Sequence, residues 1–302
     1  MQPAKRTTEE RVIGCLLGGA LGDAWGGAWE GRVGPQSFEI PAHSRVSDDT
    51  QLTLATCESI VSHGLVKPEL LAAHFAEWFV QGKIPGIGSS TLKAMRDLSA
   101  GVHWALAGNR GEYSAGSGAA MRIAPLAFLL DPTRAGERTI IRDVCRITHH
   151  NEEAYVGALA VVLAIRSVLI GTWSREHSFL ELVVGSLPDS AVRDRIETLI
   201  QLQLAPAEAA SRFGASGHVV ASVPLALSCA QYIAEDPLPV VLARAITGGG
   251  DTDTIASLTG QIAGTVVSAA GVSRDYFTGV EDNEEIFRIA RGFAQFASSQ
   301  GD

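Results

Sequence analysis

Four aspartates stand at the predicted starts of two helices that lie far apart in the chain. Asp48 and Asp49 follow Ser47, and Asp251 and Asp253 follow a run of three glycines. Asp49 can cap its helix. The adjacent carboxylates of Asp48 and Asp49 repel each other unless a cation binds both. Asp251 and Asp253 are alternate residues, whose side chains share one face of an extended segment. Such hard oxygen ligands suit Mg²⁺ or Mn²⁺ rather than zinc. These residues alone leave two interpretations open, a metal site and simple helix capping.

Glycine-rich turns precede three predicted helices, at residues 86–88, 116–118 and 248–250. Backbone N–H groups exposed in such turns can bind a phosphate, and an ordinary connector is the alternative for each turn. No lysine follows the glycines as it does in a P-loop. The pattern therefore argues against ordinary hydrolysis of nucleoside triphosphates.

A glutamate and two histidines are further candidates for chemistry. Glu30 lies in a glycine-rich segment just after the first predicted helix, near Trp25 and Trp29. A carboxylate held there can act as a general acid or base, and a solvated loop glutamate is the alternative. His149 and His150 precede a long predicted helix, where each is either a site residue or a capping or surface histidine. No nucleophile elbow and no Ser-His-Asp set follows from the spacing.

The elements that must position these residues are helices. Apolar residues recur with helical spacing along most of the chain, and Thr7 with Glu10 forms a capping-box pattern before the first helix. We expect Gly64 to end the second helix in a left-handed conformation, and Pro125 to kink or delay a later one. The expected helices cover residues 8–21, 50–63, 68–81, 92–106, 118–130, 152–170, 179–184, 191–204, 219–234, 238–245, 254–270 and 283–297. Only residues 36–40 weakly resemble a strand, so we predict an all-α protein.

The composition is typical of a folded protein and excludes several classes. Hydrophobic residues make up 46% of the 302 residues and no linker or repeat divides the chain, so we expect one domain over residues 1–302. A net charge of -9 argues against strong binding to nucleic acid or to an anionic membrane. The four cysteines match no zinc-ligand spacing, and we expect them to be buried in a reducing compartment. With no signal-peptide pattern and no membrane-spanning run, we expect a cytoplasmic monomer.

Five motifs, in order, resemble the ADP-ribosylglycohydrolase family, which includes the dinitrogenase-reductase-activating glycohydrolases and the ADP-ribosylserine hydrolases. They are Gly22-Asp23-Ala24 with Glu30, and residues 47–50, 116–122, 148–149 and 249–254. The set is specific, although each motif alone is not. The resemblance implies a compact multi-helix orthogonal bundle with two Mg²⁺ ions, or Mn²⁺, in a central cleft. It also implies hydrolysis of the glycosidic bond from C1″ of ADP-ribose to a protein side chain or a small acceptor.

The resemblance assigns roles to residues by their position in these motifs. Glu30 falls on a glutamate that is catalytic in the serine-type members, and Asp49 is the second catalytic candidate. The expected metal ligands are Ser47, Asp48, Asp49, Asp251, Asp253 and Thr254. The expected contacts to ADP-ribose are Gly86, Gly88, Tyr113, Gly116, Ser117, Gly118, His149 and Gly249.

Three positions depart from the family pattern. Ser47 stands where threonine is commoner, and Ser117 stands where asparagine is usual. Ala115 stands where some members place an aromatic residue against the adenine, and Tyr113 is the expected substitute. If Glu30 is not the working carboxylate, Asp97 is the next candidate, which would favour ADP-ribosylarginine as the substrate.

Two other functions fit the same residues. A metal-dependent phosphohydrolase acting on ADP-ribose derivatives would use the same aspartates and would release phosphate or AMP instead of free ADP-ribose. A non-catalytic relative that binds ADP-ribose or serves a structural role would keep the fold, but the four aspartates and Glu30 argue against it. Because the loops on the acceptor side vary within the family, the sequence leaves open a linkage to arginine, serine, a nucleic-acid base or a phosphate.

Overall fold

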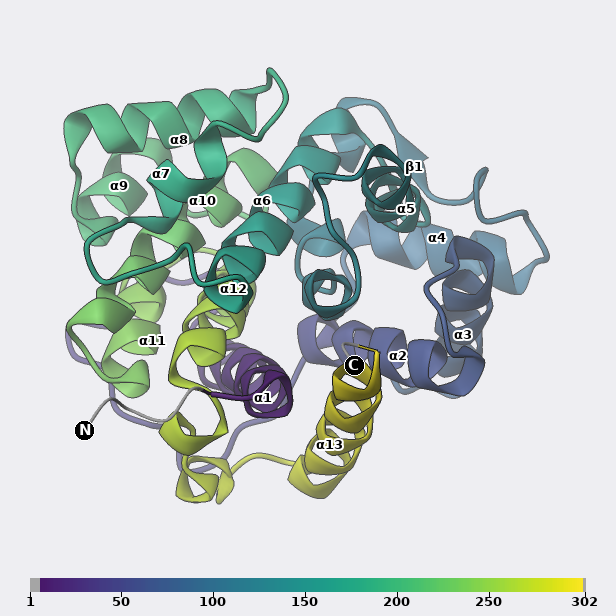
Figure 1. Ribbon diagram of the computed structural model, residues 1–302, viewed down its shortest axis with the longest axis horizontal. Helices are drawn as coiled ribbons and strands as arrows, with labels where there is room; N and C mark the ends of the chain where they lie inside the picture. Colours follow the sequence, from purple (N-terminus) through teal and green to yellow (C-terminus); the bar gives the residue numbers. More distant parts are fainter. Residues whose placement is uncertain (1–5, 301–302) are drawn as a thin grey trace.

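The computed structural model describes residues 6–300, and α-helices make up most of that part of the chain (Figure 1). The helices are α1 (Thr8–Gly26), α2 (Asp48–His63), α3 (Pro68–Val80), α4 (Ser89–Ser99), α5 (Ala135–Arg146), α6 (Glu152–Leu169), α7 (Phe179–Val184), α8 (Ala191–Leu202), α9 (Pro206–Phe213), α10 (Val219–Ala230), α11 (Leu238–Thr247), α12 (Thr252–Val267) and α13 (Asn283–Ser299). The strands described are β1 (Asn109–Arg110) and β2 (His149–His150), which pair in parallel. The prediction of an all-α protein is confirmed.

Helices α1 and α12 pack against each other at the centre of the molecule (Figure 1). The contact face of α1 carries a glycine at every fourth position, at Gly14, Gly18, Gly22 and Gly26. A Cβ at Gly18 would lie 2.3 Å from the carbonyl oxygen of Gly260, and one at Gly22 would lie 2.0 Å from that of Ala256. The absence of side chains therefore lets the two backbones touch, and it fixes the end of α1 beside the start of α12.

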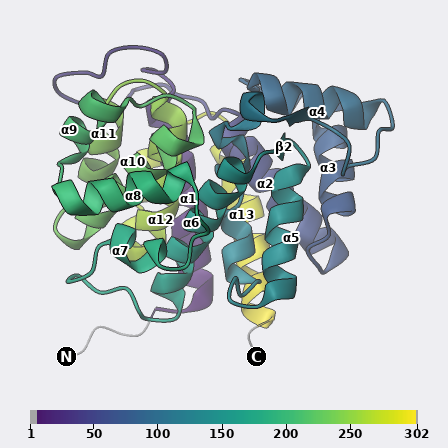
Figure 2. The same ribbon diagram turned by 90° about the horizontal axis from the view of Figure 1, so that it is seen from above.

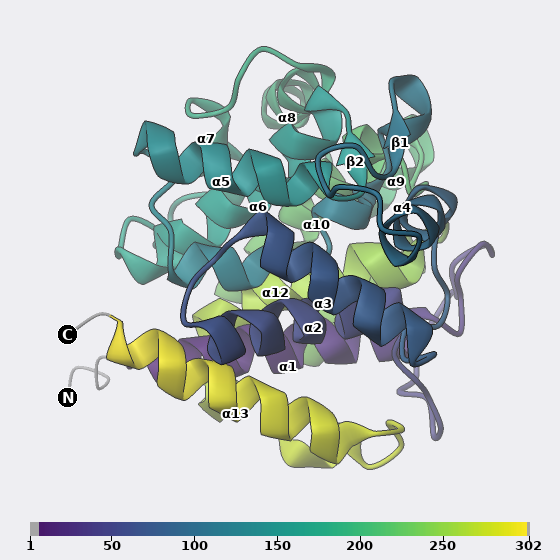
Figure 3. The same cartoon turned by 90° about the vertical axis from the view of Figure 1, so that its right-hand side faces the viewer.

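The remaining helices form two groups around this central pair (Figures 1 and 2). Helices α7 to α11 lie on one side and α2 to α5 on the other, with α6 between them. Helix α13 runs along α1 and α2 (Figure 3). Among the described residues, no helix is both long and apolar enough to cross a membrane.

The start of α2 differs from the prediction in its capping residue. The N-cap is Ser47 rather than Asp49, because the Ser47 hydroxyl oxygen accepts a hydrogen bond of 3.2 Å from the backbone N–H of Asp49. Helix α2 therefore begins at Asp48, and its first two side chains are carboxylates that capping does not use. At the other end the prediction is confirmed, since Gly64 follows the helix with a φ of 73°.

The helix predicted over residues 118–130 is wrong. This segment forms two short 3₁₀ turns, Ser117–Ala119 and Ala124–Phe128. Pro125 has no N–H to donate and interrupts the hydrogen-bond ladder. The segment is buried throughout most of its length, so tertiary packing replaces regular helical structure.

Other boundaries differ for local reasons. Helix α4 runs from Ser89 to Ser99 rather than over 92–106, and a turn through Gly101 follows it. Helix α5 was not predicted because its N-cap, Arg134, makes no side-chain capping bond. Helix α9 was not predicted although Pro206 opens it, a position that suits proline. Residues 36–40 form no strand. The four cysteines are buried and free, as expected.

Candidate active site

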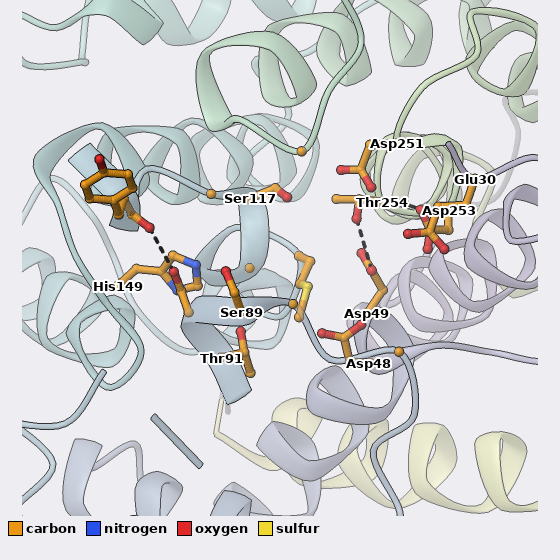
Figure 4. A pocket seen from close by; sticks show the side chains of 18 residues that line it. Glu30, Asp48, Asp49, Ser89, Thr91, Ser117, His149, Asp251, Asp253 and Thr254 are labelled. Atoms are coloured by element: carbon orange, nitrogen blue, oxygen red, sulfur yellow. Dashed lines mark hydrogen bonds between the residues drawn. The ribbon is translucent and has the colours of Figure 1, made fainter. Parts of the chain in front are cut away.

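A cavity of about 260 Å³ opens where the starts of several helices converge. Its walls come from the segment that follows α1, the starts of α2, α4 and α12, and the segments around residues 86–88, 113–121, 149 and 217 (Figure 4). Its lining residues are Glu30, Asp48, Asp49, Gly86, Gly88, Ser89, Ser90, Thr91, Tyr113, Gly116, Ser117, Gly118, Met121, His149, Gly217, Asp251, Asp253 and Thr254. Two predicted metal-ligand groups and most of the predicted ADP-ribose contacts therefore share one cleft.

The two aspartate clusters meet across this cleft (Figure 4). The hydroxyl of Thr254, in the first turn of α12, donates a hydrogen bond of 3.1 Å to Oδ2 of Asp49, in the first turn of α2. Asp48, Asp49 and Asp253 are all buried, with at most 7% of each residue exposed. The fold thus brings residues that are 205 positions apart in the sequence into direct contact.

Burial and mutual repulsion raise the pKa values of these carboxyl groups. Burial is the largest cause for Asp48, whose pKa rises to about 8, and the charges of Asp23 and Asp253 add to it. The pKa of Asp251 also rises to about 8, through burial and then through Asp253. Buried carboxylates that repel one another are stabilised in their charged form when a cation binds them.

Unused oxygen atoms in the cluster provide a further test of a cation site. Oδ1 of Asp49 and Oδ2 of Asp251 are buried and have no hydrogen-bond partner among the described residues. Such atoms are costly unless something binds them. One carboxylate oxygen from each of Glu30, Asp251 and Asp253 lies within 4.8 Å of the others. The donor set consists of carboxylate and hydroxyl oxygens, so it fits a hard divalent cation.

Glu30 reaches the cluster from the segment that follows α1. The backbone of this segment is tied to the start of α12, because Gly31 N–H donates to Gly250 O (2.8 Å) and Gly250 N–H donates to Arg32 O (3.1 Å). The negative charge of Asp253, followed by partial burial, raises the pKa of Glu30 above its ordinary value. Glu30 itself is exposed, so its carboxylate lies between the buried aspartates and solvent.

His149 lies in the cleft away from the carboxylates (Figure 4). Nδ1 of its ring is 2.7 Å from the hydroxyl oxygen of Thr148, which accepts a hydrogen bond of 2.8 Å from the buried Arg122. Burial, followed by the charge of Arg122, lowers the pKa of His149 to about 3. A Cβ at Gly118 would lie only 2.7 Å from His149 Cε1, so any side chain there would displace the imidazole. The cleft therefore presents a neutral imidazole against a glycine turn.

The rim of the cleft carries the remaining predicted contacts. Tyr113 is 91% exposed, and its backbone carbonyl accepts a hydrogen bond of 3.0 Å from the Ser90 hydroxyl. Gly86 lies against Asp48, since a Cβ there would be 3.6 Å from its Oδ1. Ser117 is buried at 7% exposure. The cleft is also lined by residues that were not predicted as site residues from the sequence: Ser89, Ser90, Thr91, Met121 and Gly217.

Asp23 is a buried residue to which the sequence analysis gave no role. Its carboxylate accepts hydrogen bonds from the backbone N–H groups of Ser47 and Thr50, each of 3.0 Å, and one of 2.5 Å from the Thr50 hydroxyl. It thus holds the N-terminus of α2 from α1. Its position within Gly22-Asp23-Ala24 was visible in the sequence, but its partner was not.

Four other candidates lie outside the cleft. Ser47 lines a neighbouring cavity instead. Gly249 is not a lining residue of either cavity, and its N–H donates to Ile246 O at 3.1 Å. His150 faces a different pocket and contacts the carbonyl of Ala107. Asp97 forms an ion pair of 2.5 Å with Lys93 and accepts a bond from Gly108 N–H. Asp97 therefore cannot replace Glu30 in this cleft.

Comparisons with known proteins agree with this geometry. The model of the family described as ADP-ribosylglycohydrolase matches residues 4–302. The chain is 26% identical to the ADP-ribosylhydrolase ARH3 of Homo sapiens, over 81% of this chain and 77% of that protein. It is 24% identical to the ADP-ribosylarginine hydrolase Tri1 of Pseudomonas putida, over 86% of this chain and 68% of that protein.

A solved structure described as an ADP-ribosylglycohydrolase-related protein complex shares the fold. It superposes with a TM-score of 0.74 at 24% identity, covering 96% of this chain and 99% of that one. The family match extends over nearly all of the chain, and the aspartates, the glycine turns at 86–88 and 116–118 and His149 converge in one cleft. The chain belongs to the ADP-ribosylglycohydrolase family and is a hydrolase.

Proposed function

We propose that this protein is a Mg²⁺-dependent hydrolase that cleaves the glycosidic bond between ADP-ribose and a protein side chain or small acceptor. The observation that carries the proposal is the shared cleft, which joins a cluster of acidic oxygens to small-residue turns and a neutral histidine. The similarity to hydrolases named for ADP-ribosylated substrates supports it at modest identity.

The cofactor that we propose is a pair of Mg²⁺ ions, with Mn²⁺ as an alternative. The residues that would hold them are Asp48, Asp49, Asp251 and Asp253, with oxygen atoms of Ser47 and Thr254. Bound there, divalent ions supply positive charge that offsets the carboxylates and acidifies water in the cleft. Although Ser47 lies in the neighbouring cavity, its hydroxyl is 3.3 Å from Oδ2 of Asp49. It therefore remains within this group.

The residues of the chain then have to place a water and move its proton. Breaking a ribosyl bond develops positive charge on the sugar. The oxygen of water bonds to C1″ while the bond from C1″ to the acceptor atom breaks, a carboxylate takes one water proton, and the acceptor atom gains a proton. We assign proton transfer to Glu30, whose raised pKa suits that task. Asp49 is the second carboxylate, because its free Oδ1 can hold the water.

The part of the cleft around its glycine turns and His149 suits ADP-ribose. The glycine turns at 86–88 and 116–118 leave room for a ligand against the backbone, where N–H groups bind phosphate oxygens. A neutral His149 adds a hydrogen-bonding ring without a charge. We assign stacking on the base to the exposed ring of Tyr113 at the rim.

The experiment that tests this function is product analysis. Purified protein with Mg²⁺ is incubated with a panel of substrates carrying ADP-ribose on arginine, on serine, on a nucleic-acid base and on a phosphate. The expected product is free ADP-ribose, and excess EDTA should abolish its release. Release of AMP together with a ribose phosphate, which follows from cleavage of the diphosphate, would establish the phosphohydrolase alternative. Tight binding of ADP-ribose without turnover of any substrate would establish a non-catalytic relative.

A further inference from the structure

A second cavity, of about 290 Å³, adjoins the cleft and shares Glu30, Gly86 and Asp253 with it. Its floor includes the buried carboxylates of Asp23 and Asp253, and its outer wall is formed by residues 43–46. If ADP-ribose occupies the first cavity, as proposed above, its scissile bond lies near Glu30 and Asp253. The second cavity then lies where the acceptor leaves.

The outer wall is held by backbone hydrogen bonds rather than being a free loop. Ser44 N–H donates to the carbonyl oxygen of Gly279 (2.8 Å), and Glu281 N–H donates to the carbonyl oxygen of Ser44 (2.9 Å). Ser44 therefore forms a parallel bridge with Val280 just before α13. His43 and Arg45 flank Ser44, and both line the cavity. The backbone bridge at Ser44 therefore fixes the backbone positions of His43 and Arg45 at the cavity wall.

The polar groups of this wall are hydrogen-bond donors without protein partners. Arg45 is exposed and has no carboxylate within 4.0 Å among residues 6–300. The hydroxyl oxygen of Ser44 is buried and has no hydrogen-bond partner in the same part of the chain. A guanidinium and a hydroxyl at a cavity wall are complementary to an oxyanion.

We propose that this second cavity is the acceptor subsite, and that Arg45 with Ser44 selects acceptors carrying an oxyanion close to the linkage. A carboxylate on a neighbouring residue of a peptide and a phosphate at the linkage are two sources of that chemistry. When the proposed divalent ions neutralise the carboxylates on the floor, Arg45 supplies the remaining charge of this cavity. An ADP-ribosylarginine acceptor would then bring its own positive charge toward Arg45, and like charges repel. The inference rests on the proposed function and extends it to substrate choice.

The test compares substrates that differ only in charge near the linkage. The substrates are ADP-ribosylserine peptides with flanking Glu, Gln or Lys residues, together with ADP-ribose 1″-phosphate and ADP-ribosylarginine. For the parent protein, kcat/KM should be higher for the Glu-flanked peptide than for the Lys-flanked one by about fivefold, the effect of one exposed charge pair. In Arg45→Gln this ratio should approach one, and Arg45→Lys should restore part of it.

Charge reversal and a matched control separate a local effect from a general one. Arg45→Glu should invert the preference, so that the Lys-flanked peptide becomes the better substrate. Arg175→Gln alters another exposed arginine outside both cavities and should leave the ratio unchanged. Raising the salt concentration should weaken the preference of the parent protein, because exposed charges are screened.

The outcomes distinguish this inference from the function on which it rests. If no substrate releases ADP-ribose, the proposed function fails and the acceptor assignment fails with it. If several substrates are hydrolysed at rates that do not depend on the flanking charge, and Arg45→Gln changes neither these rates nor the rate for the 1″-phosphate, only the acceptor assignment is overturned. A preference that Arg45 controls for the phosphate substrate but not for the Glu-flanked peptide supports the assignment and identifies phosphate as the source.

Discussion

Glu30 is the residue whose proposed role depends most on its surroundings. Its carboxylate lies beside Asp253, whose charge raises its pKa, yet the residue is exposed. The substitution Glu30→Gln keeps the shape and removes the charge, so turnover should fall by about 100-fold or more, the scale of a positioned acid or base. ADP-ribose affinity, measured by calorimetry, should change little because the glycine turns and His149 are untouched.

The matched control for Glu30 is Asp97→Asn, which alters the other carboxylate that the sequence suggested. Asp97 is bound to Lys93 and Gly108 outside the cleft, so its substitution should leave turnover near that of the parent. Equal turnover in Glu30→Gln and the parent would transfer the proton-handling role to an aspartate of the cluster, of which Asp49 is the first candidate.

The lowered pKa of His149 predicts how the stability of the protein depends on pH. Its folded-state pKa of about 3 lies below the ordinary value of 6.5. Above pH 6.5 the imidazole is neutral in both states and stability is unaffected. As the pH falls from 6.5 toward 3, the unfolded chain binds a proton that the folded chain does not. This residue therefore lowers the free energy of unfolding by about 1.4 kcal/mol per pH unit in that window.

The measurement compares urea unfolding of the parent and of His149→Gln between pH 7 and pH 4. The variant should lose stability less steeply than the parent as the pH is lowered, whatever its stability at pH 7. Taking the difference between the two proteins removes the opposite contribution of the buried carboxyl groups, whose pKa values are raised. Parallel curves would show that His149 is protonated in the folded protein.

At the residue scale, the sequence predicted site residues that are adjacent in the chain. It did not predict the roles of residues whose partners are distant in the sequence. The aspartate pairs were visible because each pair lies at one helix start. Asp23 and Arg122 were not assigned roles, because their hydrogen-bond partners, Thr50 and Thr148, are distant in sequence. Asp97 does not line the cleft, and Lys93, one helical turn away, pairs with its carboxylate.

At the scale of elements, the contact between α1 and α12 decides where the site residues stand. The end of α1 leads to Glu30 and the start of α12 carries Asp253. The substitution Gly22→Ala would place a Cβ 2.0 Å from the carbonyl oxygen of Ala256. Alanine favours a helix by about 1 kcal/mol over glycine, but separating two packed backbones costs about 1–3 kcal/mol or more. The clash should win, and the urea midpoint should fall.

A glycine on a free helix face provides the control for this prediction. Gly292 lies in α13, and a Cβ there meets no atom within 4 Å. Gly292→Ala should therefore raise the urea midpoint, because only the helix propensity changes. If Gly22→Ala also stabilised the protein, the close contact between α1 and α12 would be wrong.

Helix existence was predicted better than helix boundaries, and the exceptions have physical causes. Helices with a strong stop such as Gly64 end where expected. The stretch around Pro125 has helical apolar spacing, but it is buried and forms 3₁₀ turns. The preceding turn, Ser117–Ala119, places Gly118 against His149, an arrangement that local propensity does not encode.

At the scale of the whole molecule, the site joins residues near the two ends of the chain. The hydrogen bond from Thr254 to Asp49 spans most of the sequence, and the family match over residues 4–302 covers all the elements that make this contact. The sequence placed both aspartate clusters at helix starts. Only the antiparallel packing of α1 on α12, with Asp23 holding α2, brings them together.

This arrangement predicts that a divalent cation stabilises the entire fold. An ion that binds the folded state alone adds about 2.7 kcal/mol to the free energy of unfolding when its concentration is 100 times its Kd. Mg²⁺ or Mn²⁺ should therefore raise the Tm of the parent by several degrees, and EDTA should reverse the rise.

The variant Asp253→Asn should lose most of this metal-induced shift. In EDTA its Tm should be no lower than that of the parent, because one repelling charge has been removed. Asp189→Asn changes an exposed aspartate outside both cavities and should keep the full shift. An identical metal-induced shift in Asp253→Asn would mean that the ion binds elsewhere.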